Sequence, residues 1–106
     1  IIAGGYDKNV AFDELGQKIA KDAKTAILLG KTAEKIADAI KASPKNKTRI
    51  EFVNSLAEAV QLANRLSESG DVVLLSPACA SYDMFDNFQQ RGQEFCRLVH
   101  QISGWL

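Results

Sequence analysis

The chain of 106 residues has few of the residue types that mark several protein classes. Two cysteines, Cys79 and Cys96, are too few for a disulfide framework. They suit a reducing cytosol, and we interpret both as small, at least partly buried apolar groups. The one histidine, His100, is expected at the surface or at a helix end. The longest aliphatic runs, 26–29 and 72–75, are far shorter than the ~20 residues of a membrane span, so no membrane insertion is expected.

An excess of charge of one sign is also missing. Thirteen Lys and Arg residues balance thirteen Asp and Glu residues. A protein that binds nucleic acid usually carries a stronger basic field, so no nucleic-acid partner is expected. Apolar residues make up 46% and charged residues 25%, which is typical of a globular protein and excludes disorder as the main state.

The length predicts one domain that spans residues 1–106. The chain begins on an apolar run, without Met, without a basic region and without a cleavage site. We therefore expect no signal peptide, and we expect the domain to be excised from a longer protein.

Short aliphatic runs alternate with helical patterns along the chain. Each run is ended by a turn-forming residue, which predicts strands over 1–3, 25–29, 49–53 and 71–75. Apolar residues at helical spacing predict helices over 12–19, 33–40, 56–63 and 95–102. Strands that are apolar throughout are buried on both faces, and helical crossovers cover them. The fold class predicted is therefore α/β, a Rossmann-like doubly wound, mainly parallel sheet with helices on both faces.

Two local signals refine this pattern. Ser55 and Glu58 form a capping box at the start of the third helix. Gly92 within the last helical pattern indicates close packing or a break near Arg91, because glycine weakens a helix interior.

A ligand site is expected beyond the carboxyl ends of the strands, where the strand order reverses. The first strand should be central with the fourth beside it, so the loops 4–9 and 76–83 should face each other. Lys8 supplies a cation to the first loop. Ser81 can cap a helical turn over 82–85, whose free amides favour an anion. Taken alone, Lys8 fits a solvated loop lysine better than a ligand-binding residue, whereas Ser81 is equally a simple cap.

Other sites fit the sequence less well. The run 30–32, Gly-Lys-Thr, imitates the end of a phosphate loop, but Thr25 stands where that loop needs glycine, so a plain turn is predicted. A phospho-acceptor module needs an acidic cluster after the first strand and an aspartate after the third. Here Asp7 stands alone and Asn54 ends the third strand. A non-catalytic, flavodoxin-like binding or signalling module is the alternative function.

Both ends of the chain resemble a known family. The stretch 71–95, DVVLLSPACASYDMFDNFQQRGQEF, closely resembles the C-terminal end of the Mur ligases. The opening IAGGYDK, residues 2–8, resembles the start of the same domain. Residues 12–70 fit the family in pattern rather than in identity.

The resemblance implies the C-terminal, amino-acid-binding domain of a three-domain, cytoplasmic, ATP-dependent ligase of peptidoglycan synthesis. It is strongest to the members that add D-glutamate to UDP-N-acetylmuramoyl-L-alanine. By this resemblance Lys8 would pair with one carboxylate of D-glutamate, the Ser81 hydroxyl would bind the other, and Phe88 would contribute its backbone amide nearby.

The resemblance also implies that several functions of the enzyme belong to domains outside this chain. ATP and Mg²⁺ are expected to bind mainly to absent domains, above all the central one, and the first domain is expected to hold the UDP-sugar substrate. The central and N-terminal domains are also the expected partners of this domain. No cofactor, metal site or catalytic residue is expected in this chain, and the isolated domain is expected to be inactive.

Overall fold

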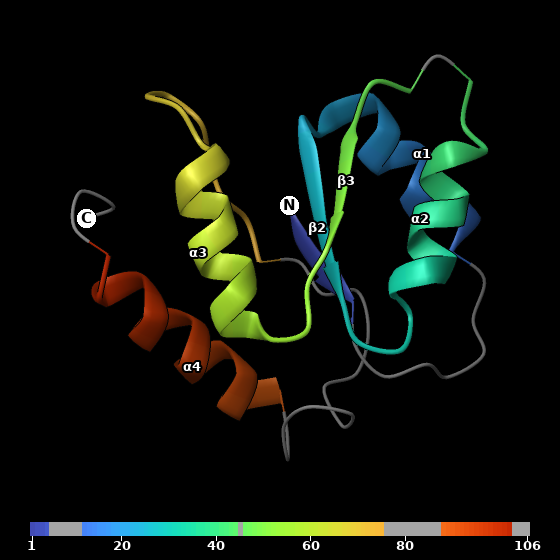
Figure 1. Cartoon of the computed structure of the whole chain (residues 1–106). Coiled ribbons are helices and arrows are strands. Elements are labelled where there is room, and N and C mark those ends of the chain that lie inside the picture. The colour runs from blue at the N-terminus through green and yellow to red at the C-terminus, as the bar shows by residue number, and fades with distance from the viewer. Residues whose placement is uncertain (5–11, 45, 76–87, 103–106) are drawn as a thin grey trace.

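The computed structural model describes residues 1–4, 12–44, 46–75 and 88–102. The described part contains three strands and four helices (Figure 1). The strands are β1 (Ile2–Gly4), β2 (Thr25–Leu29) and β3 (Arg49–Phe52). The helices are α1 (Asp13–Asp22), α2 (Ala33–Lys41), α3 (Leu56–Leu66) and α4 (Phe88–His100). None of these helices is long and apolar enough to span a bilayer.

The sheet is parallel and its order reverses at β1. β1 pairs with β2, and β2 pairs with β3 on its other side. Segment 71–75 then returns to the free side of β1, where Leu75 forms a parallel bridge with Ile2. The Ile2 N–H also donates to the Leu74 carbonyl oxygen at 2.9 Å. The chain thus winds outward from β1 to β3 and comes back to its starting point, which confirms the predicted doubly wound fold.

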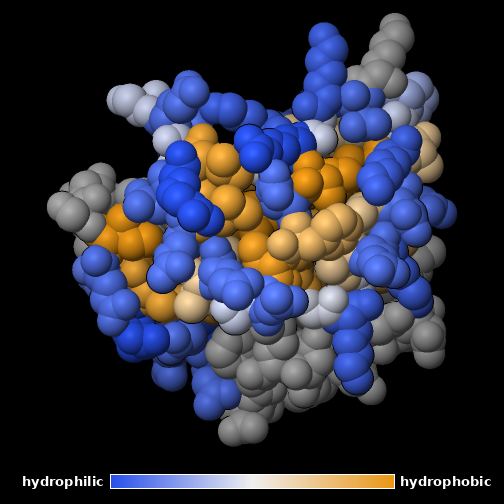
Figure 2. Space-filling model, viewed as in Figure 1, coloured by the Kyte–Doolittle hydropathy of each residue, from blue (hydrophilic) through white to orange (hydrophobic). Residues whose placement is uncertain are grey.

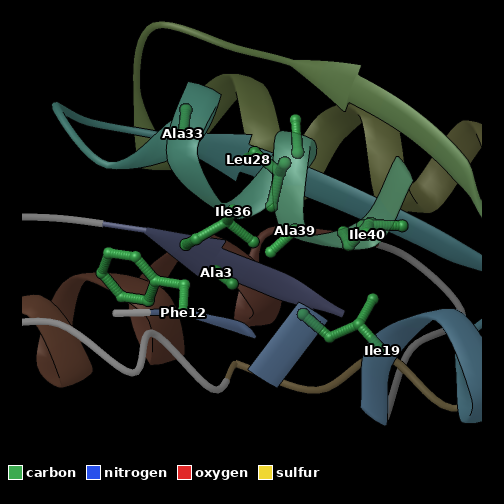
Figure 3. Close-up of a cluster of buried hydrophobic side chains, with 10 residues drawn as sticks. Ala3, Phe12, Ile19, Leu28, Ala33, Ile36, Ala39 and Ile40 are labelled. Atoms are coloured by element: carbon green, nitrogen blue, oxygen red, sulfur yellow. The ribbon is translucent and has the colours of Figure 1, made fainter. Parts of the chain in front are cut away.

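Helices cover both faces of the sheet, and each face has its own core. On one face α1 and α2 cover a cluster that includes Ala3 and Leu28 of the strands (Figure 3). On the other face α3 and α4 cover Ile2, Ile27 and Leu29. Successive strand residues point to opposite faces, which explains why neighbours enter different cores. Right-handed crossovers change face when the winding direction reverses, which explains why α3 leaves the face of α1 and α2.

The predicted fourth strand is corrected by the structure. Over 71–75 only Leu75 has a bridge, and the preceding residues are irregular. Val73 and Leu75 pack against the core of α3 and α4. Val72 and Leu74 are 86% and 55% exposed. A strand in a parallel sheet is stable when both faces are covered, and here one face of the segment is open within the described part.

Four smaller predictions have different outcomes. The Ser55 hydroxyl accepts a hydrogen bond from the Glu58 N–H at 3.1 Å, as expected of a cap. The Glu58 carboxylate, however, accepts from the Asn54 N–H at 2.8 Å rather than from Ser55.

The expectation for Gly92 is wrong, because α4 continues through it and a Cβ built there meets nothing within 4 Å. Cys96 is exposed rather than buried, because it lies on the outer side of α4, whereas Cys79 lies outside the described residues. His100 is exposed at the end of α4, as predicted.

β3 forms the edge of the described sheet that lies opposite segment 71–75. Figure 2 shows a band of apolar side chains across this face of the molecule, bordered by hydrophilic residues. Phe52 of β3 is 53% exposed. Arg49 and Glu51 of the same strand form an ion pair at 2.7 Å. Charged side chains on an edge strand oppose pairing with other chains, so this edge is protected by its own sequence.

Candidate functional site

The candidate site lies at the carboxyl edge of the sheet, between β1 and segment 71–75. The chain reverses its winding direction between these two elements, which is where ligands bind in open α/β sheets. Because Ile2 and Leu75 are paired in parallel, β1 and the segment run toward the same edge side by side (Figure 1). The loops that follow Gly4 and Leu75 therefore start as neighbours, as the sequence predicts.

Gly4 shapes the start of the first loop. Its φ angle is +122°, a backbone conformation that residues other than glycine rarely adopt. A Cβ at this position would lie 1.9 Å from the carbonyl oxygen of Leu29, its partner in β2. Only glycine therefore allows the chain to leave β1 in this direction. The contact depends on the strand register, so sequence patterns alone do not reveal it.

The turn after β2 does not form a phosphate loop. Gly30 adopts a φ angle of +79°, and α2 begins three residues later at Ala33. Thr25 to Leu29 are all within β2, so the wide glycine-rich loop that would cradle phosphates has no place before Gly30. The predicted plain turn is confirmed.

The described residues also offer no metal site. Over 1–4, 12–44, 46–75 and 88–102, no group of three or more His, Cys, Asp or Glu side chains could hold a metal ion. The donor set for Mg²⁺ and the loop for ATP phosphates are thus not found in this part of the chain.

One of the three predicted binding residues lies within the described part. Phe88 is the first residue of α4. The first four N–H groups of a helix have no acceptor within the helix, and they carry partial positive charge. The Phe88 amide is therefore of the kind that the predicted role requires. Lys8 and Ser81 lie outside the described residues, as does the predicted helical turn 82–85.

One ion pair with shifted pKa values lies at the opposite, amino edge of the sheet, and another lies on α4. At the amino edge, the Lys24 Nζ lies 3.0 Å from Asp71 Oδ2, and this hydrogen bond raises the pKa of Lys24. The Glu68 N–H and Lys24 both donate to the Asp71 carboxylate and lower its pKa. On α4, a hydrogen bond from Arg97 lowers the pKa of Glu94.

Comparisons with known proteins agree with this geometry. The sequence profile of a family described as "Mur ligase, glutamate ligase domain" matches residues 1–79. A UDP-N-acetylmuramoylalanine–D-glutamate ligase of Caldicellulosiruptor bescii is 46% identical over 103 residues, which are 96% of this chain and 22% of the relative. The proteins of the same name from Clostridium tetani and Clostridium botulinum are 44% and 47% identical over 105 residues, which are 96% of this chain and 23% of each relative.

This chain spans about a fifth of the length of these curated relatives. The profile covers about three quarters of the chain, including all three strands and the first three helices. The relatives extend the similarity over nearly all of it. The matched residues form the doubly wound sheet described above. These matches show that the chain belongs to the Mur ligase family, as its glutamate ligase domain.

Proposed function

We propose that this chain supplies the D-glutamate site of a cytoplasmic, ATP-dependent ligase that adds D-glutamate to UDP-N-acetylmuramoyl-L-alanine in peptidoglycan synthesis. The family and the names of the relatives support the reaction. The pairing of Ile2 with Leu75 is the observation that supports the site, because the sequence segments that carry Lys8 and Ser81 follow these two neighbouring residues. The relatives' names give no support to the alternative of a non-catalytic module.

The chemistry of the three residues suits a doubly negative amino acid. D-Glutamate has two carboxylates, and each needs a donor. The Lys8 ammonium would bind one of them through a charge-assisted hydrogen bond. The Ser81 hydroxyl and the Phe88 amide would bind the other, with the positive end of α4 behind them. This arrangement leaves the amine of D-glutamate unbound and able to attack.

The contribution of this chain is binding and orientation. Neither Lys8 nor Ser81 is assigned a proton transfer, and no catalytic residue is proposed in this chain. Holding the amine close to the activated carboxyl group of the second substrate reduces the entropic part of the barrier. ATP and Mg²⁺ supply that activation, and we place their binding in the domains that the relatives have beyond this one.

The test is the Lys8→Ala substitution in the full-length protein. We expect the KM for D-glutamate to rise strongly and the KM for ATP to stay nearly unchanged, because the proposed role of Lys8 is to bind only the amino acid. Ser81→Ala should weaken D-glutamate binding by roughly 1–3 kcal/mol, as expected for a lost bond to a charged group.

Lys47→Ala is the matched control. Lys47 is exposed and precedes β3, so it lies at the opposite, amino edge of the sheet. It should leave both constants unchanged. An unaltered KM for D-glutamate in Lys8→Ala, or a loss of ATP binding in Ser81→Ala, contradicts the site.

A further inference from the structure

The stretch of sequence that carries Lys8 lies between two described residues, Gly4 and Phe12. Lys8 is midway between them in the sequence, so both anchor points limit where it can lie. The first anchor is fixed by the sheet. Gly4 is paired with Leu29 of β2, and a Cβ on Gly4 would lie 1.9 Å from the Leu29 carbonyl oxygen. The chain therefore leaves β1 from a tightly packed position beside the end of β2.

The second anchor is the ring of Phe12. Phe12 occupies the N-cap position of α1, where its side chain makes no capping hydrogen bond. Small polar residues such as Ser and Asp are preferred at this position, so the contribution of phenylalanine lies in its packing. The residue is 7% exposed and belongs to the buried cluster that contains Ala33 and Ile36. Figure 3 shows its ring toward the end of the cluster at which Ala33 begins α2, away from Ile40.

Both anchors lie on the same part of the fold. α2 begins at Ala33, shortly after β2 ends at Leu29, so the first turn of α2 lies at the carboxyl edge of the sheet. Gly4 contacts the end of β2, and Phe12 packs near the start of α2. The chain on either side of Lys8 is thus held at the edge where the candidate site lies. A stretch of chain that is held at both ends has fewer conformations, so less entropy is lost when a ligand orders it.

We propose that Phe12 is a positioning residue for the binding of D-glutamate, and that it acts through Lys8. This rests on the proposed function, in which the Lys8 ammonium binds one carboxylate of the amino acid. The packed ring fixes the point at which the chain enters α1, and it thereby restricts the positions that Lys8 can occupy before the substrate binds. Phe12 itself touches neither the substrate nor ATP.

The test is a double-mutant cycle in the full-length protein, with the KM for D-glutamate and the KM for ATP as readouts. Phe12→Ala should raise the KM for D-glutamate about three- to tenfold, because a less restricted chain must be ordered on binding, and should leave the KM for ATP unchanged. Adding Phe12→Ala to Lys8→Ala should cause little further rise, because the lysine through which Phe12 acts is then absent. If Phe12→Ala does not fold, Phe12→Val, which removes fewer buried atoms, takes its place in the cycle.

Ile40→Ala is the matched control. Ile40 is fully buried in the same cluster, at the end away from Phe12. Its truncation should also lower the stability of the core, yet it should leave both KM values unchanged. An equal rise of the KM for D-glutamate in Ile40→Ala, an unchanged KM in Phe12→Ala, or fully additive effects of Phe12→Ala and Lys8→Ala would overturn the inference. Failure of the proposed function is distinguishable, because it would appear as an unchanged KM for D-glutamate in Lys8→Ala itself.

Discussion

Two glycines in helices show how the same residue serves opposite purposes. Gly16 of α1 is buried against α2, and a Cβ there would lie 2.4 Å from the Cβ of Ala39. The two helices can pack this closely only because Gly16 has no side chain. Gly92 of α4 has nothing within 4 Å, so there glycine only adds freedom to the unfolded chain.

Alanine substitutions at these glycines should therefore shift stability in opposite directions. Gly92→Ala should raise the free energy of unfolding by about 0.5–1 kcal/mol, the usual helix preference for alanine. Gly16→Ala should lower it by about 1–3 kcal/mol, because α1 and α2 must move apart. Urea denaturation of both variants measures the two changes. A gain in stability in Gly16→Ala would contradict the close packing of α1 on α2, and a loss in Gly92→Ala would contradict the open surroundings of Gly92.

At the scale of elements, segment 71–75 depends on contacts at its two ends. Leu75 is paired with Ile2 at one end. At the other, the Asp71 carboxylate accepts hydrogen bonds from the Glu68 N–H at 2.8 Å and from Lys24 at 3.0 Å. Gly70, with a φ angle of +95°, forms the turn between Glu68 and Asp71. The carboxylate thus ties the start of the segment to the residue that precedes β2.

The pKa of Asp71 is a measure of the two hydrogen bonds that its carboxylate accepts. We expect it to lie below the ordinary value of about 3.9, because the charged form accepts both hydrogen bonds. Lys24→Ala should raise the pKa only part of the way, since the Glu68 N–H is the larger cause. NMR titration of the side-chain carboxyl group measures both values. A pKa at the ordinary value in the parent chain, or full recovery in Lys24→Ala, would contradict the contact.

The direction of the pH effect follows from this lowered pKa. The unfolded chain binds the proton more tightly than the folded chain, so acid favours unfolding. The contribution of Asp71 to stability is present above the unfolded-state pKa. It is lost as the pH falls through the lower, folded-state pKa.

The elements differ in how well sequence patterns predict them. The strand 25–29 is predicted with its bounds and the helix at 33–40 to within one residue, because each combines a clear period with a turn former at its end. The strand at 71–75 has an equally apolar sequence, yet only Leu75 pairs. Val72 and Leu74 are exposed within the described part, and whether such a run is buried on both faces depends on tertiary packing that the local sequence does not specify.

For the whole molecule, the position of the site is more predictable than its contacts. The alternation of strands and helices predicts that segment 71–75 returns to the side of β1, which the bridge at Leu75 confirms. The contact of Gly4 with Leu29 depends on the register between β1 and β2. The distances from Lys8 and Ser81 to a ligand depend on loops that have no periodic pattern, so their roles stay predictions.

The most direct test is a crystal structure of the full-length protein with bound D-glutamate. We predict that the amino acid lies beyond Gly4 and Leu75, with Lys8 Nζ within about 3.2 Å of one carboxylate and Ser81 Oγ within the same distance of the other. The Phe88 amide should point toward the carboxylate held by Ser81. D-Glutamate bound at another place, or with Lys8 and Ser81 too far apart to be bridged by it, would contradict the account.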